Sequence, residues 1–212
     1  MIIELYGLPG SGKTTLARKL AAESNFEIVK IRTKRDLIFY NLLFLFSHPV
    51  KFIVLFCYLV INYNGRKEFY LNLMNNFLGA NAKYLKARNV KNAIIDQGYF
   101  QGLTSISRKR ISAETLARYA DNIVKPDKLI VLDVSDEELA RRVGGRGYFA
   151  RAGFEDNEIK DWETVMREND KIIKDNLKRL GIGYSLIKSD NLDCAFEELK
   201  RGLEDHSERH KK

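Results

Sequence analysis

Short apolar segments alternate with segments of helical periodicity along most of the 212-residue chain. The apolar segments lie at residues 2–6, 27–31, 93–96, 129–133 and 184–187. Three of them are nearly unbroken aliphatic runs, which predict strands that are buried on both faces of a parallel sheet. The intervening segments repeat apolar residues at helical spacing, as Leu16, Ala17, Leu20 and Ala21 do. This alternation predicts an α/β fold, a three-layer sandwich built around a doubly wound sheet.

Two helix boundaries can be assigned from local chemistry. Ser135 and Glu138 form a Ser-x-x-Glu capping box after the fourth strand. A long helix is expected over about 155–180, with acidic residues at its start, basic residues at its end and Gly181 as its stop.

The segment between the second and third strands is much longer than a simple crossover, which needs about a dozen residues. Its excess, about 33–88, is apolar and of helical period. We therefore expect a single domain over 1–212, with a helical insertion at 33–88 that forms the substrate side.

Residues 37–61 are very apolar but are interrupted by Asn41, by Ser47-His48-Pro49 and by Lys51. A membrane-spanning helix needs about 20 consecutive apolar residues. The pattern favours two short buried helices, with Ser47 as a cap and Pro49 in the first turn of the second. A peripheral membrane contact and a homodimer interface stay open as alternatives for this segment.

Composition says little about the fold, but it narrows the range of possible binding partners. The formal net charge of +8 suits a phosphate-bearing partner, without selecting among nucleotides, nucleic acid and anionic membranes. Cys57 and Cys194 make no metal-ligand spacing, and we expect reduced thiols in a cytoplasmic protein. No signal peptide is expected at the amino terminus.

The strongest chemical signal is the sequence GLPGSGKT at residues 7–14, which matches G-x-x-x-x-G-K-T between an apolar strand and an amphipathic helix. Glycines let the backbone amides curl around phosphates, and the following helix directs its positive end at the same anions. We expect Lys13 to reach the β- and γ-phosphates of ATP and Thr14 to ligate Mg²⁺. The residues expected to bind the cofactor are Gly7, Pro9, Gly10, Ser11, Gly12, Lys13, Thr14, Thr15 and Arg142.

Two later features point towards phosphoryl transfer. Asp96 follows the third strand, at the sheet edge where ligands bind in open α/β folds, so its carboxylate can serve Mg²⁺ or accept a proton. The segment at about 141–154 interleaves four arginines with four glycines. It is expected to be a hinged lid that brings guanidinium charge to the transferring group.

The order of the P-loop, Asp96 and the sequence LIVLDVSDEELARRVGGRG resembles the nucleoside and nucleoside-monophosphate kinases, especially the thymidylate-kinase-like group. The resemblance covers residues 1 to about 190. It implies the P-loop NTPase fold with five parallel strands in the order 2-3-1-4-5, and Mg-ATP-dependent transfer to a small-molecule acceptor. By motif position it implies catalytic roles for Lys13, Asp96, Arg142 and Arg146, and metal contacts for Thr14 and Asp96.

The acceptor site is less well marked. The thymidylate-kinase-like proteins usually have arginine after the strand-end acid, whereas this chain has Gln97, and a nucleoside, nucleotide or sugar acceptor stays open. Tyr99 either stacks on the acceptor or lies in the core. Arg108 either grips an acceptor phosphate or belongs to a solvated charge run. The full set of candidate acceptor contacts is Arg32, Arg35, Asp36, Gln97, Tyr99, Arg108 and Arg151.

Two other functions compete with a small-molecule kinase. One is a P-loop NTPase that couples hydrolysis to a partner. The other is a polynucleotide 5′-kinase, which the +8 charge favours. Nucleic acid is not the expected partner, because the chain lacks an aromatic-plus-basic module for binding a single strand.

Overall fold

The computed structural model describes residues 1–62, 65–105, 109–144 and 156–209. Five parallel strands form one sheet in the order β2-β3-β1-β4-β5, as the resemblance implied. The strands are β1 (Ile2–Tyr6), β2 (Glu27–Ile28), β3 (Ala93–Ile95), β4 (Lys128–Asp133) and β5 (Gly183–Lys188). The three-layer α/β prediction is therefore confirmed.

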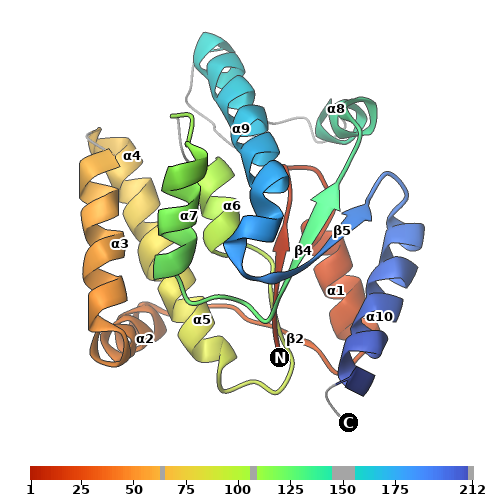
Figure 1. Cartoon of the computed structure of the whole chain (residues 1–212), viewed down its shortest axis with the longest axis horizontal. Helices are drawn as coiled ribbons and strands as arrows, with labels where there is room; N and C mark the ends of the chain where they lie inside the picture. The colour runs from red at the N-terminus through yellow and green to blue at the C-terminus, as the bar shows by residue number, and fades with distance from the viewer. Residues whose placement is uncertain (63–64, 106–108, 145–155, 210–212) are drawn as a thin grey trace.

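Helices cover both faces of the sheet (Figure 1). One face is covered by α1 (Lys13–Glu23) and α10 (Leu192–Arg209), which pack on Ile3 and Leu5 of β1. The opposite face carries the larger core, which contains Tyr6 of β1. Its helices are α2 (Lys34–Ser47), α3 (Pro49–Asn62), α5 (Ala80–Ala87), α6 (Tyr99–Ser105), α7 (Ala113–Asn122) and α9 (Asp156–Asn176). This alternation follows from the two-residue period of a strand, which sends successive side chains to opposite faces.

The long connection between β2 and β3 is helical. It contains α2, α3, α4 (Arg66–Leu71), the π-helix η1 (Asn72–Gly79) and α5. Sequence periodicity predicted ordinary helix over 72–79, and it does not distinguish the wider π-turn from an α-turn. π-helical turns are rare and often occur at functional sites. Here the π-helix packs against α6, the helix that follows β3.

The predicted boundaries need three corrections. β2 stops at Ile28 instead of residue 31, because it is an edge strand paired only with β3. Ser47 is the last residue of α2, where its hydroxyl donates to the Leu43 carbonyl, so it does not cap α3. In addition, α2 and α3 are not fully buried helices as expected, because only their inner sides pack against the rest of the chain.

The later helices follow the predicted signals closely. The Ser135 hydroxyl accepts from the Glu138 amide at 3.4 Å and opens α8 (Asp136–Gly144). However, the second half of the capping box is replaced, because the Ser135 amide donates to Asp190 at 2.8 Å. α9 continues into the 3-10 turn η2 (Leu177–Leu180), and Gly181 ends it in the left-handed conformation at φ 61°, as predicted.

Candidate functional site

The phosphate loop connects β1 to α1 and is curled as its sequence predicts. Gly12 precedes α1 with φ 94°, and a Cβ atom there would lie 2.3 Å from Leu192 Cδ2. Any other residue would therefore be strained by this backbone conformation, and the Leu192 side chain would have to move. Because glycine has no side chain to cap the helix, the first amides of α1 stay available for a ligand. This is the geometry of an anion site at a helix amino terminus.

Lys13 lies over the loop from its first helical position. Its amine donates to the carbonyls of Gly7 at 2.7 Å and Leu8 at 2.8 Å, and it is 3.3 Å from the Ser11 hydroxyl. Its side chain nevertheless lines the adjoining cleft, and Thr14 and Thr15 are exposed beside it. The loop thus presents one cation and two hydroxyl groups to the same space.

A cleft of about 740 Å³ adjoins the loop, and its volume is in the range of small-molecule and cofactor pockets in general. One wall is the phosphate loop and the start of α1. The other wall comes from the long insertion between β2 and β3, including its π-helix. The polar residues that line it outside the loop are Arg32, Thr33, Lys34, Asn75, Asn76, Lys83, Gln97 and Gln101.

The π-helix supplies residues that sequence reasoning missed. Asn75 is exposed on the cleft, and the Asn76 amide donates to Asn72 at 2.6 Å and to the Gly102 carbonyl at 3.1 Å. These bonds tie η1 to α6 and fix the wall opposite the phosphate loop. Three asparagines within an apolar helical run were the available signal, since such residues are disfavoured in helix interiors.

Lys83 is the second residue that the sequence did not single out. Its amine donates to the Gln97 carbonyl at 2.7 Å, just beyond β3. Burial lowers the pKa of Lys83, while the charges of Asp96 and Glu4 oppose that shift. Lys83 therefore places a positive charge beside Gln97, at the position where thymidylate-kinase-like proteins usually have an arginine.

Asp96 is half-buried at the end of β3. The residues that follow it, Gln97 and Gly98, line the cleft, whereas the Asp96 side chain is not part of the cleft wall. The sequence thus located the strand end correctly, and the catalytic role of Asp96 stays a prediction.

Glu4 lies fully buried beneath this strand end. Its carboxylate accepts from the Phe100 amide at 2.9 Å and from the Tyr84 hydroxyl. Burial raises the pKa of Glu4 to about 7, although these hydrogen bonds act in the opposite direction. A Cβ atom at Gly98 would lie 2.5 Å from the Glu4 carboxyl carbon, so the loop passes directly over this group. Glu4 therefore positions the segment that carries Gln97.

Arg142 braces the phosphate loop from α8. Its guanidinium donates to Glu138 at 2.6 Å, to the carbonyls of Ser189 and Asp190 at 2.7 Å, and to the Gly10 carbonyl at 3.4 Å. Hydrogen bonds from Arg141 and Arg142 hold the pKa of Glu138 down to about 2. In this arrangement Arg142 reaches the loop from outside the cleft, and direct contact with ATP stays a prediction.

The candidate acceptor contacts fall into three groups. Arg32 and Gln97 line the cleft. Arg35 and Asp36 are not part of the cleft wall, and Asp36 instead lies 4.0 Å from Lys86. Arg108, Arg146 and Arg151 lie outside the described residues, as does most of the predicted lid at 141–154.

The expected contact between Tyr99 and an acceptor needs correction. Tyr99 is fully buried, stacks on Tyr84 at 4.7 Å and donates its hydroxyl to Asn81 at 2.6 Å. Because α6 begins at Tyr99, the first turn of the helix directs this ring into the core. Trp162, which is also mostly buried, contributes instead to the cleft wall beside Leu8 of the loop.

Comparison with known proteins agrees with this geometry. A family model described as an AAA domain matches residues 3–163. The chain belongs to the AAA-domain family. No curated protein matches it by sequence.

Solved structures resemble it in fold, at low sequence identity. A deoxyadenosine kinase from M. mycoides with dCMP and dCDP bound has a TM-score of 0.60 and 17% identity, covering 97% of this chain and 100% of its own. The thymidylate kinase of Candida albicans has a TM-score of 0.54 and 16% identity, covering 97% and 92%. The YorR protein of Bacillus subtilis, solved with phosphorylated GDP, has a TM-score of 0.53 and 16% identity, covering 98% of each chain. The AAA-domain protein described here therefore has the nucleotide-kinase fold.

Proposed function

We propose that this AAA-domain protein transfers the γ-phosphate of Mg-ATP to a small-molecule acceptor that is a nucleoside, a nucleotide or a sugar. The observation that carries the proposal is one cleft with two unlike walls. The phosphate loop forms one wall, and polar groups from a separate helical insertion form the other. A protein that only hydrolyses ATP needs no second recognition wall, whereas a phosphotransferase must hold two substrates together.

The phosphate wall fits a triphosphate. The curled loop, the open amides at the start of α1 and the Lys13 amine supply donors and positive charge. These groups would hold the β- and γ-phosphates and neutralise charge that develops on the transferring group. Lys13 would exchange its carbonyl partners in the loop for phosphate oxygens.

Mg²⁺ fits the same wall. The exposed Thr14 hydroxyl is a hard oxygen donor at the phosphate side of the cleft, and Asp96 directly follows the neighbouring strand β3. Within the described residues, no group of three His, Cys, Asp or Glu side chains is placed to hold a metal ion. Mg²⁺ bound through Thr14 and phosphate oxygens would supply charge neutralisation during transfer.

The acceptor wall would select the second substrate. Arg32, Lys34 and Lys83 offer positive charge, and Asn75 and Gln97 offer hydrogen bonds. This combination suits an acceptor that carries hydroxyl groups and an anionic or strongly polar group. Asp96 is the base proposed to accept the proton of the attacking hydroxyl.

The test is a panel of nucleosides, nucleoside monophosphates, sugars and oligonucleotides with γ-labelled ATP and Mg²⁺. We expect label to appear on one class of small acceptor, with ADP formed in equal amount. Rapid hydrolysis without any labelled product would instead identify an NTPase, and transfer only to oligonucleotide ends would identify a polynucleotide kinase. Either result would overturn the proposal.

A further inference from the structure

The outward side of α2 and α3 is apolar. On α2, the exposed residues are Ile38, Phe39, Leu42, Leu43 and Phe46, of which Phe46 is 80% exposed. On α3, they are Val50, Ile53, Val54, Phe56, Val60 and Ile61. We call these two sets the apolar face. In the part of the chain that the structure describes, the large hydrophobic residues exposed elsewhere are Tyr70, Tyr184 and Leu186.

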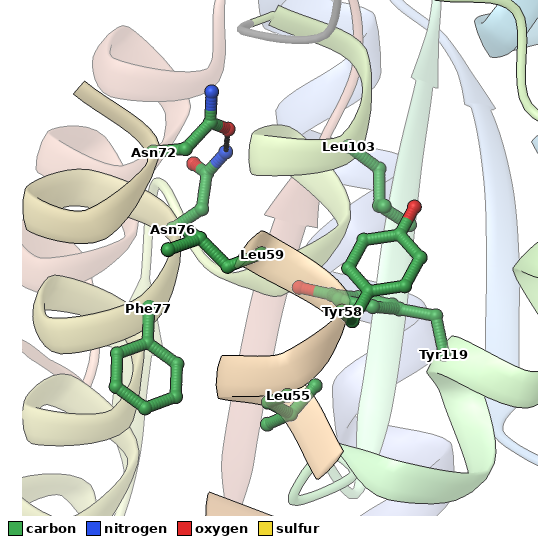
Figure 2. A pocket seen from close by; sticks show the side chains of 8 residues that line it. All are labelled: Leu55, Tyr58, Leu59, Asn72, Asn76, Phe77, Leu103 and Tyr119. Carbon is green, nitrogen blue, oxygen red and sulfur yellow. Dashed lines mark hydrogen bonds between the residues drawn. The ribbon is translucent and has the colours of Figure 1, made fainter. Parts of the chain in front are cut away.

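The inner side of the same helices already forms the core. Phe44, Leu55 and Leu59 are buried. Figure 2 shows Leu55, Tyr58 and Leu59 of α3 directed towards Phe77 and Tyr119, around a cavity of only about 20 Å³. That space holds roughly one water molecule and is too small for a ligand. The apolar face is thus not needed for packing, and a helix at the surface of a globular protein normally has polar residues there.

Charged side chains are almost absent from the apolar face and lie just before it in the sequence. Between residues 37 and 61 the only charged side chain is Lys51, whose amine points inward and donates to the Ile123 carbonyl at 2.7 Å. Exposed Arg32, Lys34 and Arg35 precede the face, together with one acid, Asp36, which lies 4.0 Å from Lys86. An apolar surface bordered by a segment of net positive charge complements an anionic lipid surface.

The same charges favour lipid over a second copy of the chain. A two-fold contact would place the apolar face against itself, and residues 37–61 contain no acidic side chain that could pair with these cations. A bilayer of anionic lipids attracts Arg32, Lys34 and Arg35.

The geometry favours contact with the surface of a bilayer. Among the described residues, no single helix is long and apolar enough to cross a membrane, and α2 and α3 pass that test only as a pair. The two helices are bent by 115° at His48 and lie along one margin of the molecule (Figure 1). Helices of this kind place their apolar side chains just below the headgroups without spanning the bilayer.

We propose that the apolar face of α2 and α3 docks this protein on an anionic membrane. Arg32, Lys34 and Leu37 adjoin this surface and also line the cleft, so docking brings the acceptor wall next to the lipid headgroups. The proposal does not depend on phosphotransfer, and its test measures binding alone.

The two cysteines allow a matched experiment. Cys57 is exposed on α3 within the apolar face, and Cys194 is exposed on α10, which covers the opposite face of the sheet. A Cys194→Ser protein is labelled at Cys57 with an environment-sensitive fluorophore, and a Cys57→Ser protein is labelled at Cys194. With vesicles that contain phosphatidylglycerol, we expect a blue shift and stronger emission from the Cys57 label only. An equal response from both labels, or no response from either, would overturn the proposal.

Vesicle sedimentation provides the second measurement. The double variant Phe46→Ser/Ile61→Ser removes two strongly exposed apolar side chains and should weaken binding about tenfold or more. Leu186→Ser removes an exposed apolar residue of β5 and should leave binding unchanged. Circular dichroism and thermal melting verify that both variants fold. If the unmodified protein ignores the vesicles and is a dimer that the double variant dissociates, the face joins two copies and the proposal fails. A monomer that ignores the vesicles also refutes it.

Discussion

Lys13 is the residue on which the proposed transfer depends most. Its amine is the cation at the phosphate loop that also lines the cleft. We expect Lys13→Met to lower the turnover number about 100-fold or more, because a charge directed at the developing negative charge of the transition state is lost.

Lys19→Met is the matched control for this prediction. Lys19 lies on the same helix and contacts Asp193 of α10 at 2.8 Å, away from the cleft. Turnover with the acceptor found in the panel should stay unchanged in Lys19→Met. Full activity in Lys13→Met would contradict the assigned role of this lysine.

Glu4 predicts a pH dependence of stability. Burial raises its pKa to about 7 in the folded protein, from an ordinary value of 4.5. The folded state therefore holds this proton over a pH range in which the unfolded state has lost it. The stabilisation is complete below about pH 4.5 and is lost as the pH rises through about 7, up to about 3 kcal/mol.

The variant Glu4→Gln tests that dependence. Glutamine cannot ionise, and it can accept from the Phe100 amide while donating to the Tyr84 hydroxyl oxygen. Its advantage over the unmodified protein in the free energy of unfolding should therefore grow from pH 5 to pH 8, as measured by urea denaturation. Parallel curves for the two proteins would show that Glu4 does not titrate in this range.

At the scale of elements, a side chain at Gly12 would strain the junction between the phosphate loop and α1. Its φ of 94° disfavours residues other than glycine, and a Cβ atom would also displace the Leu192 side chain, 2.3 Å away. Gly12→Ala should cost about 2 kcal/mol or more in the free energy of unfolding and should weaken binding of ATP. Calorimetric titration and denaturation measure the two effects.

Gly202→Ala is the comparison for this loss. Gly202 lies in α10, and a Cβ atom there would come no closer than 3.7 Å to the Lys128 amine. Alanine should be neutral or stabilising by up to about 1 kcal/mol at this position, because it restricts the unfolded chain. If both variants lose the same amount of stability, the backbone conformation at Gly12 does not penalise a side chain.

Arg142 joins three elements, since it links α8 to the phosphate loop and to the turn after β5. Arg142→Ala should cost about 2 kcal/mol of stability, because Glu138 and several carbonyls lose a charged donor. It should also weaken ATP binding, because the loop loses its brace.

The variant Arg141→Ala is the control that distinguishes loss of the brace from loss of one positive charge. Arg141 pairs with the same Glu138, but its side chain is 76% exposed. Solvent screens such a pair, so Arg141→Ala should change stability and ATP affinity little. If the two variants have the same stability and the same ATP affinity, Arg142 does not brace the phosphate loop.

At the scale of the whole molecule, the cleft couples ligand binding to folding. Mg-ATP that binds only the folded chain should add about 2.7 kcal/mol of stability at a concentration of 100 times its Kd. For a chain of this length, that corresponds to a rise in Tm of roughly 5–10 °C. Differential scanning fluorimetry measures the shift. A Tm that does not respond to Mg-ATP would exclude the phosphate loop as a nucleotide site.

Much of the architecture was predictable because it depends on local pattern. The buried strands, the phosphate loop and the helix stop at Gly181 all follow from residue types at fixed spacing. The sheet order came from the resemblance and was confirmed. The capping box at Ser135 was only half correct, because a distant residue, Asp190, took the serine amide.

The sequence by itself determined that this chain carries a glycine loop and a lysine at the head of a helix, since both depend on neighbours along the chain. Only the tertiary structure decided which side chains share the cleft with that loop. Lys83 and Asn75 face it, whereas Tyr99 is fully buried in the core. The reason is physical: the direction in which a helical residue points is set by what the helix packs against, and those contacts join residues far apart in the chain. The same packing left one apolar side of α2 and α3 exposed, which no local pattern could reveal.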